Sequence, residues 1–324
     1  MITTTGYPEH GGRSLRDVGV PRGGPLSRGL LAAVAAILLA AAAADSTAAE
    51  DAYTFTTLAG PKGEMFLPQA INGKGQIVGE YHGGGLADAS VHGALRGVDG
   101  RIAVIDHPDG RFTRLMGINA RGQIVGTAVD EKALFGFVRE PDGRFARLTL
   151  KPDAPNSRPI PAAINDRGVI LGSDTDGRGR PRDFVRQEDG GFRVLPAYGS
   201  NSYLGINSGE RVVGHFLDIT LSRRGLLLDE KGKPTLIDWP KTTLTEARAI
   251  NDEGVIVGIY LNLDPAFGLH RSFVRDAKGK LSPFDFPGAK ETQAAGINAA
   301  GHIVGRYEDK EGSHGFLAVP KTRP

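Results

Sequence analysis

The sequence predicts an all-β fold, a six-bladed β-propeller of four-stranded blades, and three observations predict it. A short phrase recurs six times at steps of 42 to 47 residues, which is the period of a repeat architecture. Each repeat contains short apolar segments separated by turn residues, the pattern of β-strands. The last repeat lacks its fourth strand, and a segment with the right pattern stands at the opposite end of the chain.

The recurring phrase predicts a hairpin turn. Its first copy reads A-I-N-G-K-G-Q-I-V-G from Ala70, and an Asn followed three residues later by Gly is typical of a type I turn with a bulge at the Gly. The fourth copy places Gly209 one position early, which predicts a different turn type there. The six turn asparagines are Asn72, Asn119, Asn165, Asn207, Asn251 and Asn298.

A second glycine ends the apolar run after each turn. Because Gly weakens a strand, its return in every copy predicts a close approach of two backbones. We interpret the asparagines and these glycines as structural, since six equivalent turns are expected and six equivalent catalytic asparagines are not. The glycines are Gly79, Gly126, Gly172, Gly214, Gly258 and Gly305.

Two further strands follow in each repeat. The third carries an aromatic or aliphatic core, as in Phe135–Val138, and the fourth follows a Gly turn, as in Arg144–Leu150. Five such closing strands are present for six repeats. We expect Tyr53–Leu58 to supply the sixth and complete the last blade, because a ring closed in this way exposes no sheet edge.

Residues 1–49 have the pattern of a signal peptide. Arginines lead into an uncharged run from Gly29 to Ala44, and small residues follow. The run is shorter than the ~20 apolar residues that a membrane span requires. We therefore expect residues 50–324 to form the mature propeller domain, periplasmic or extracellular, with no membrane span after cleavage.

Composition narrows the classes of partner. The chain has 39 Lys and Arg against 37 Asp and Glu, so nothing indicates a nucleic-acid partner. It has no cysteine, which excludes disulfides and thiolate metal sites. We expect a monomer.

The repeats resemble the extracellular HAF-repeat family, in which a His-Ala-Phe-like triplet follows the phrase I-N-x-x-G-x-I-V-G. His92-Gly93-Ala94 and His314-Gly315-Phe316 match the triplet best. The other copies carry Phe or Arg at the His position, which argues against a shared metal or catalytic role for it. The resemblance covers Tyr53–Pro320 and implies bacterial export and a repeat fold, but it implies no biochemical activity.

The topology predicts where a ligand would bind. The Asn turns and the turns before the closing strands lie on one face, and longer, more variable connections lie on the other, which we call the variable-loop face. Variable loops on a rigid scaffold are the usual place for binding residues. Aromatic residues near this face could stack on a sugar or grip a peptide, or else fill gaps between blades. They are Tyr81, Tyr198, Phe216, Trp239, Tyr260, Phe286 and Tyr307.

The sequence favours a binding module over an enzyme. Asp174-Thr175-Asp176-Gly177 resembles the opening of a calcium loop, but the later acidic ligands are missing, and an ordinary polar turn explains it better. No local motif indicates another cofactor, a metal site or catalytic residues. We expect a carbohydrate, peptide or protein ligand. The alternative is a propeller hydrolase, lactonase or lyase with a divalent cation at the central channel.

Overall fold

A computed structural model describes residues 49, 51–60, 63–83, 91–131, 133–150, 157–175, 179–263 and 269–321. Residues 1–48 and residue 50 are not described. The predicted signal peptide, apart from Ala49, therefore lies outside the described residues, as do Asp176 and Gly177. No helix within the described ranges is long and apolar enough to cross a bilayer.

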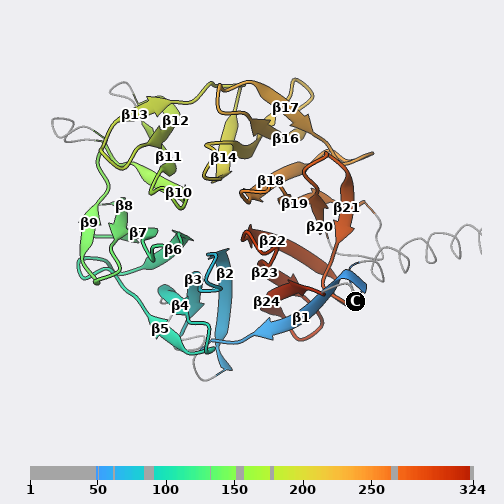
Figure 1. The fold of residues 1–324 in the computed structure, drawn as a ribbon, viewed down its shortest axis with the longest axis horizontal. Coiled ribbons are helices and arrows are strands. Elements are labelled where there is room, and N and C mark those ends of the chain that lie inside the picture. Colours follow the sequence, from blue (N-terminus) through green and yellow to red (C-terminus); the bar gives the residue numbers. More distant parts are fainter. Residues whose placement is uncertain are drawn as a thin grey trace, which may run out of the picture. The chain divides into compact units, whose positions relative to one another are not determined.

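The described residues form six four-stranded antiparallel sheets arranged as the blades of a ring, so the predicted six-bladed propeller is confirmed (Figure 1). The innermost strands are β2 (Met65–Ile71), β6 (Thr113–Ile118), β10 (Ile160–Ile164), β14 (Asn201–Ile206), β18 (Thr245–Ile250) and β22 (Glu291–Ile297). The second strands are β3 (Ile77–His82), β7 (Ile124–Val129), β11 (Ile170–Thr175), β15 (Val212–Leu217), β19 (Ile256–Leu261) and β23 (Ile303–Glu308).

The third strands are β4 (Val91–Arg96), β8 (Leu134–Arg139), β12 (Pro181–Arg186), β16 (Arg223–Leu228), β20 (His270–Arg275) and β24 (Ser313–Pro320). The outermost strands are β5 (Ile102–Val104), β9 (Phe145–Arg147), β13 (Phe192–Val194), β17 (Pro234–Ile237), β21 (Leu281–Phe284) and β1 (Tyr53–Leu58). Several outer strands are shorter than predicted: β9 covers three residues of Arg144–Leu150. We number the blades 1 to 6 from the blade that contains β2 to the blade that contains β22.

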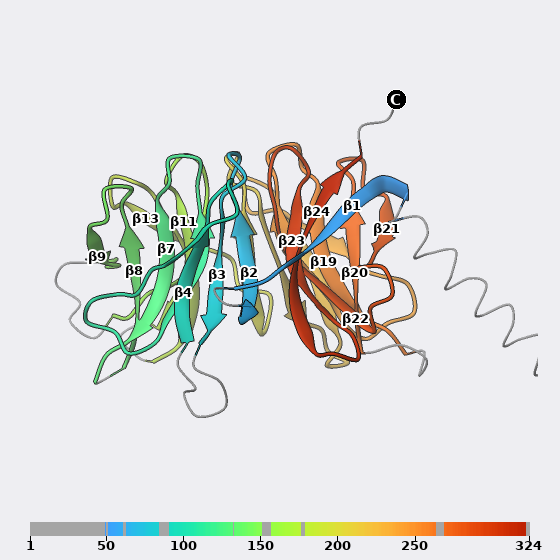
Figure 2. The same cartoon turned by 90° about the horizontal axis from the view of Figure 1, so that it is seen from below.

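The N-terminal strand completes the sixth blade, as predicted. Tyr53 pairs with Pro320 and Leu58 with Gly315, so β1 is the outer strand beside β24. Strand β2 in turn contacts β22, β23 and β24, which closes the ring between the two ends of the chain. Seen edge-on, the strands run through the thickness of the ring (Figure 2).

The hydrophobic core is divided among the six gaps between blades. Each gap holds one cluster of buried side chains from two neighbouring blades. The aromatic positions of the third strands supply fully buried rings at Phe137, Phe184, Phe273 and Phe316. Burying one such ring contributes about 2–3 kcal/mol, so the six gaps together hold the blades in place.

The fourth Asn turn corrects one sequence-based expectation. Glu210 adopts a left-handed backbone with φ of 57°, and its N–H donates to the Asn207 carbonyl at 3.0 Å. Gly75 makes the same bond to Asn72 at 3.0 Å, so the turn is of the same type in both copies. The early Gly209 does not shift it. Ion pairing of Glu210 with Arg193 at 3.2 Å offsets part of the strain of a non-glycine residue there.

Candidate functional site

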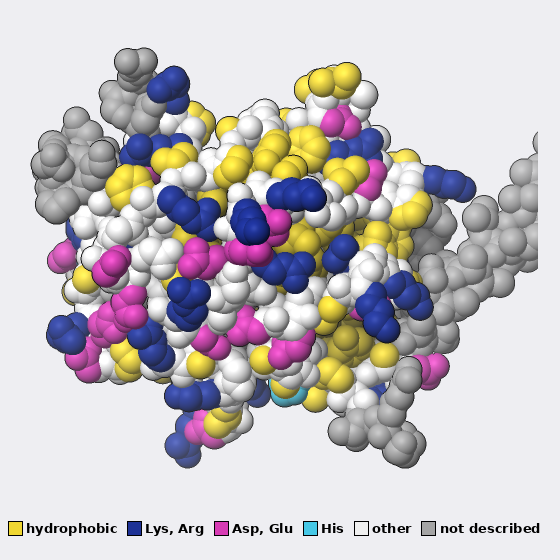
Figure 3. All heavy atoms as spheres, turned by 45° about the horizontal axis from the view of Figure 1, so that its top comes forward, with side chains coloured by type: hydrophobic (Ala, Val, Ile, Leu, Met, Phe, Trp, Pro, Cys, Tyr) yellow, Lys and Arg dark blue, Asp and Glu magenta, His cyan; other side chains and the backbone are white. Residues whose placement is uncertain are grey.

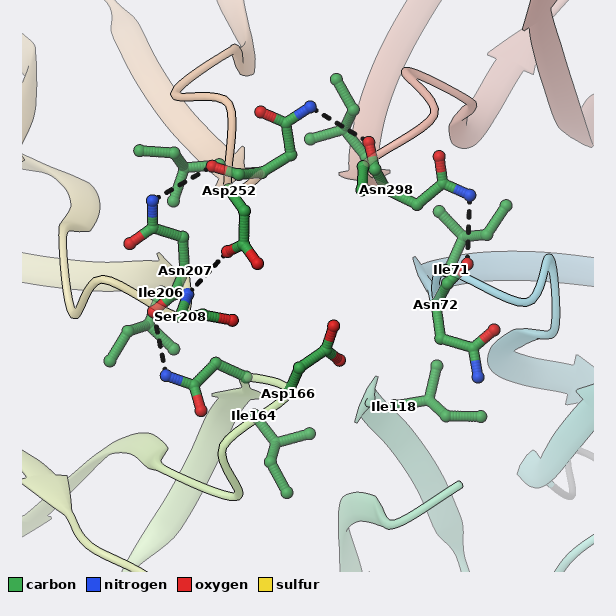
Figure 4. A pocket seen from close by; sticks show the side chains of 16 residues that line it. Ile71, Asn72, Ile118, Ile164, Asp166, Ile206, Asn207, Ser208, Asp252 and Asn298 are labelled. Atoms are coloured by element: carbon green, nitrogen blue, oxygen red, sulfur yellow. Dashed lines mark hydrogen bonds between the residues drawn. The ribbon is translucent and has the colours of Figure 1, made fainter. Parts of the chain in front are cut away.

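The six asparagines form a closed ring of hydrogen bonds at one end of the central channel. Figure 4 shows part of this ring, including Asn207, Asn298 and Asn72. Asn72 Oδ1 accepts the backbone N–H groups of Lys74 and Gln76, both at 3.0 Å, which shapes its own turn. Its Nδ2 donates to the backbone carbonyl of Asn119 in the next blade at 3.0 Å. The same bond repeats around the ring at 2.9–3.1 Å, and Asn298 returns it to Asn72. Asp could not replace Asn, because a carboxylate has no N–H to donate.

A ring of isoleucines lies directly behind the amide ring. Each precedes its Asn in the sequence and is 5–8% exposed, and with the asparagines other than Asn119 they line a recess of about 90 Å³. They are Ile71, Ile118, Ile164, Ile206, Ile250 and Ile297. This end of the channel is therefore narrow and apolar behind its rim, and every blade contributes Ile and Asn to it. The residue after each Asn differs between blades, and Asp166 and Asp252 accept hydrogen bonds from the backbone N–H groups of Ala120 and Ser208, both at 2.7 Å.

The second glycine of each copy lets the two inner strands approach closely. A Cβ on Gly79 would lie 2.1 Å from the Leu67 carbonyl oxygen, and one on Gly214 would lie 2.1 Å from that of Ser202. The close approach accompanies a β-bulge in each innermost strand, which leaves one extra residue per blade. The six bulge residues line the channel behind the isoleucines: Gln69, Met116, Ala162, Leu204, Arg248 and Ala295.

The bulge residues differ from blade to blade, and they make the channel asymmetric. Arg248 of blade 5 helps to line a pocket of about 200 Å³ with Gln293 and Arg306 of blade 6 and Gln69 and Glu80 of blade 1. We call this the polar pocket. It lies on the opposite side of the isoleucine ring from the amide ring, because strands β3 and β23 run from the Asn turns toward the variable-loop face.

Charged groups around Arg248 are held by buried contacts. Glu246 is 5% exposed and accepts hydrogen bonds from Arg223 and from Arg248, the latter at 3.3 Å. Burial by itself would raise the pKa of the Glu246 carboxyl, but the charge of Arg248 and the hydrogen bond from Arg223 outweigh burial and hold it below its usual value. Burial lowers the pKa of Arg248, and the nearby Arg306 charge lowers it further. Burial likewise lowers the pKa of His215 beside this group.

An apolar groove of about 530 Å³ opens beside blade 2. Its lining comes from residues at or near the variable-loop ends of blades 1 to 3. The exposed fractions of Phe112 and Leu134, 43% and 44%, show that part of this lining meets solvent. The apolar lining residues are Val91, Phe112, Met116, Val129, Leu134 and Ile160, and Arg114 and Thr127 complete it.

One ion pair joins the polar pocket to the apolar groove. Glu80 lines the pocket and Arg114 lines the groove, and Arg114 Nε lies 2.8 Å from Glu80 Oε2. The two hollows are therefore neighbours at the channel. Elsewhere on the surface in view, Lys, Arg, Asp and Glu side chains are interspersed with hydrophobic ones (Figure 3).

The aromatic candidates from the sequence lie between or within blades. Trp239 stacks on Tyr260 with ring centroids 4.1 Å apart, and Phe286 stacks on Tyr307 at 3.7 Å. Each pair joins an outer connection of one blade to the second strand of the next. The other three candidates do not belong to these stacked pairs. The hydroxyl of Tyr81 donates a hydrogen bond to Glu64, and Tyr198 and Phe216 pack on the core between blades 3 and 4. None of the seven is among the residues that line the polar pocket or the groove.

The residue at the His position of the repeat triplet contacts an acidic side chain in five blades, and in three of them the acid lies fourteen residues later. His92 Nδ1 lies 2.7 Å from Asp106, Arg224 lies 2.9 Å from Asp238, and Arg271 lies 2.7 Å from Asp285. In each of these three pairs the basic residue lies at or near the start of the third strand. The acidic residue follows the outermost strand, fourteen residues later in the sequence. That constant spacing is a sequence signal for the pair.

The described residues contain no cluster of three or more His, Cys, Asp or Glu side chains suited to a metal ion. Asp174, from the calcium-like segment, accepts hydrogen bonds from Ser157 at 2.9 Å and from Arg182 at 3.2 Å. Sequence reasoning missed the polar pocket and the groove. The detectable signal was the residue three places before each Asn, which is of five different types in the six copies, while the three residues after it are always Ala or Gly, then Ile, then Asn.

Fold and site together define a propeller whose channel has a repeated ring of Ile and Asn at one end and a bulge residue that varies between blades toward the other. No family model and no curated protein matches the sequence. Among solved structures, TolB from Acinetobacter baumannii matches with a TM-score of 0.53 and 10% identity, over 76% of this chain and 64% of TolB, less than two thirds of its length. A gluconolactonase from Xanthomonas campestris matches with a TM-score of 0.50 and 13% identity, over 83% of this chain and 90% of its own. A putative gluconolactonase matches with a TM-score of 0.50 and 11% identity, over 84% and 93%. At these identities the likeness shows the fold alone.

Proposed function

We propose that this propeller is an exported binding module that holds an apolar segment of a peptide or protein in the groove beside blade 2. The groove is the observation that supports this proposal most directly. Its volume of about 530 Å³ is in the range of known ligand pockets, and its lining is largely apolar with two polar side chains. Export is supported by the signal-peptide pattern of residues 1–49.

The lining favours a peptide over a sugar. Sugars are usually held by flat aromatic faces with polar neighbours, and five of the six apolar lining residues here are aliphatic. An extended segment with a Leu, Ile or Phe side chain would bury Phe112 and Leu134 and remove exposed apolar surface from water. Thr127, which is 7% exposed and also lines the groove, offers a hydroxyl to such a segment.

Peptide selection tests the proposal. A random heptapeptide library is selected on the purified chain, and the affinity of the selected peptides is measured for two variants. Leu134→Glu places a charge in the groove, whereas Leu236→Glu places the same charge on the outer strand β17, where Leu236 is 56% exposed. Both positions are on the surface, so both variants are expected to melt as the parent chain does.

We expect selected peptides rich in Leu, Ile or Phe that bind the Leu236→Glu variant normally and the Leu134→Glu variant at least about tenfold more weakly, a difference of ~1.4 kcal/mol. Equal binding to both variants, or no selected peptide, would refute the groove as the binding site.

A further inference from the structure

The polar pocket contains more hydrogen-bond donors than the protein itself satisfies. Arg306 is exposed, and within the described ranges its guanidinium has no hydrogen bond or ion pair. Arg248 uses its Nε and one N–H of each terminal nitrogen on Glu246 and Gln293, at 3.3 Å each. Since a guanidinium has five N–H groups, two remain.

Gln293 adds a third donor. It is 6% exposed, and its Oε1 accepts the hydrogen bond from Arg248. Its amide nitrogen makes no hydrogen bond to another described residue, although the side chain lines the pocket. Gln293 and Arg306 are directly paired on β22 and β23, so their side chains lie on the same face of blade 6.

The charge of the region is positive. Four arginines, at 114, 223, 248 and 306, stand with two glutamates, at 80 and 246. Both carboxylates already have cationic partners: Glu246 has Arg223 and Arg248, and Glu80 has Arg114 at 2.8 Å. The region therefore has an excess of two positive charges, and Arg306 is the one of these four arginines that has no carboxylate partner among the described residues. Two like charges near one pocket repel each other, and an anion between them relieves that repulsion.

We infer that the polar pocket is a binding site for an oxyanion, a carboxylate or a phosphate, held by Arg306 and Arg248 with the amide of Gln293. The planar fork of Arg matches both oxyanions with paired hydrogen bonds. Given the peptide role proposed above for the groove, we assign the oxyanion of the natural ligand to a carboxylate, the C-terminus of the bound segment. The Glu80–Arg114 pair between the two hollows places that carboxylate next to the apolar side chain.

Small anions test the site without any peptide. Acetate and inorganic phosphate are titrated separately at constant ionic strength, and the unfolding midpoint is followed, because a ligand of the folded state raises it by mass action. The variant is Arg306→Gln, which changes an exposed side chain. The control is Arg101→Gln, whose side chain is 91% exposed just before the outer strand β5 and does not line the pocket. We expect at least about tenfold weaker anion binding in Arg306→Gln and no change in Arg101→Gln.

Peptides selected on the groove then identify the source of the oxyanion. We expect the free-acid form to bind at least about tenfold more tightly than the C-terminal amide, and this difference to vanish in Arg306→Gln. In Leu134→Glu, peptide binding should weaken while acetate binding stays as in the parent chain, so a failed groove and a failed anion site give different results.

Three outcomes would overturn parts of the inference. If neither anion raises the midpoint, or if Arg306→Gln responds like the parent chain, the oxyanion site is wrong. If phosphate binds and acetate does not, the site takes phosphate and the carboxylate assignment is wrong. If acid and amide peptides bind equally while acetate still binds, the site exists but does not hold the peptide C-terminus.

Discussion

Replacing Asn165 by Asp tests whether the amide ring holds the blades together. The two side chains have the same shape, but a carboxylate cannot donate to the Asn207 carbonyl oxygen, which lies 2.9 Å from Asn165 Nδ2. The contacts of Oδ1 with the amides of Arg167 and Val169 remain. The substitution therefore removes one bond between blades 3 and 4 and sets oxygen against oxygen where Asn165 is only 4% exposed.

The expected magnitude follows from the burial of this contact. Leaving a buried acceptor without its donor costs about 1–3 kcal/mol. Because a charged oxygen also replaces the N–H, we expect the upper end, a loss of ~3 kcal/mol in the free energy of unfolding at pH 7.5. At ~2 °C per kcal/mol for a large domain, the midpoint should fall by roughly 6 °C.

Urea unfolding followed by fluorescence measures the change, since the chain has one tryptophan, Trp239, which stacks on Tyr260 between blades 4 and 5. Ser208→Asp is the matched control. It adds the same charge at the same end of the channel, at a position where the third and fifth copies naturally carry Asp166 and Asp252. If Asn165→Asp is as stable as this control, the ring contributes nothing to stability and our reasoning about Asn is wrong.

Three further changes test backbone and charge effects. Leu221 has φ of 59° and is 81% exposed, so Leu221→Asn should raise the unfolding midpoint by the equivalent of about 1 kcal/mol, and a lower midpoint would contradict the strain. Gly214→Ala would put a Cβ 2.1 Å from a backbone oxygen and should lower the free energy of unfolding in urea by ~3 kcal/mol or more. A Cβ on Gly73 would meet nothing within 4 Å, so Gly73→Ala should lower it little. Equal losses in the two variants would exclude the close approach as the cause. Burial raises the pKa of Asp183 to about 6, above its value in the unfolded chain, so the folded state carries a poorly solvated carboxylate above that pH and stability falls as pH rises from about 4 to above 6. Asp183→Asn should therefore raise the midpoint at pH 8 and leave it unchanged at pH 3.5, and the same gain at both pH values would exclude titration of Asp183.

Most of the fold could be predicted because the same strand and turn pattern occurs six times in the sequence. The phrase around each Asn contains a turn and two strands, and its spacing sets the size of one blade. Tyr53–Leu58 could be assigned to the last blade by counting strands, and its pairing with β24 confirms that assignment. The predicted type of the fourth turn was wrong because the prediction relied on the position of Gly alone. Glu210 accepts the left-handed conformation there, and its contacts with Arg193 and Gln187 offset part of the cost.

The candidate site could not be predicted in the same way. The search for aromatic residues near the variable-loop face found Trp239, Tyr260, Phe286 and Tyr307, which pair across blade boundaries. A strand pattern gives the side of a sheet on which a residue lies, but a β-bulge changes that alternation, so the channel-facing position of Arg248 was hidden.

The difference between the two channel ends explains where a ligand should be sought in this molecule. At one end every blade contributes Ile and Asn, whose backbone and side-chain groups are committed to each other. The residue after each Asn does vary there, but the two carboxylates at that position, of Asp166 and Asp252, already accept hydrogen bonds from the neighbouring blades. At the other end the bulge position is free to vary, because its side chain points into the channel and takes no part in the strand ladder. Selective binding needs a particular arrangement of charge and apolar surface, which sixfold repetition cannot provide. Arg248 at the bulge and the Glu80–Arg114 pair beside it are departures from the repeat, and for that reason they are the residues to change first.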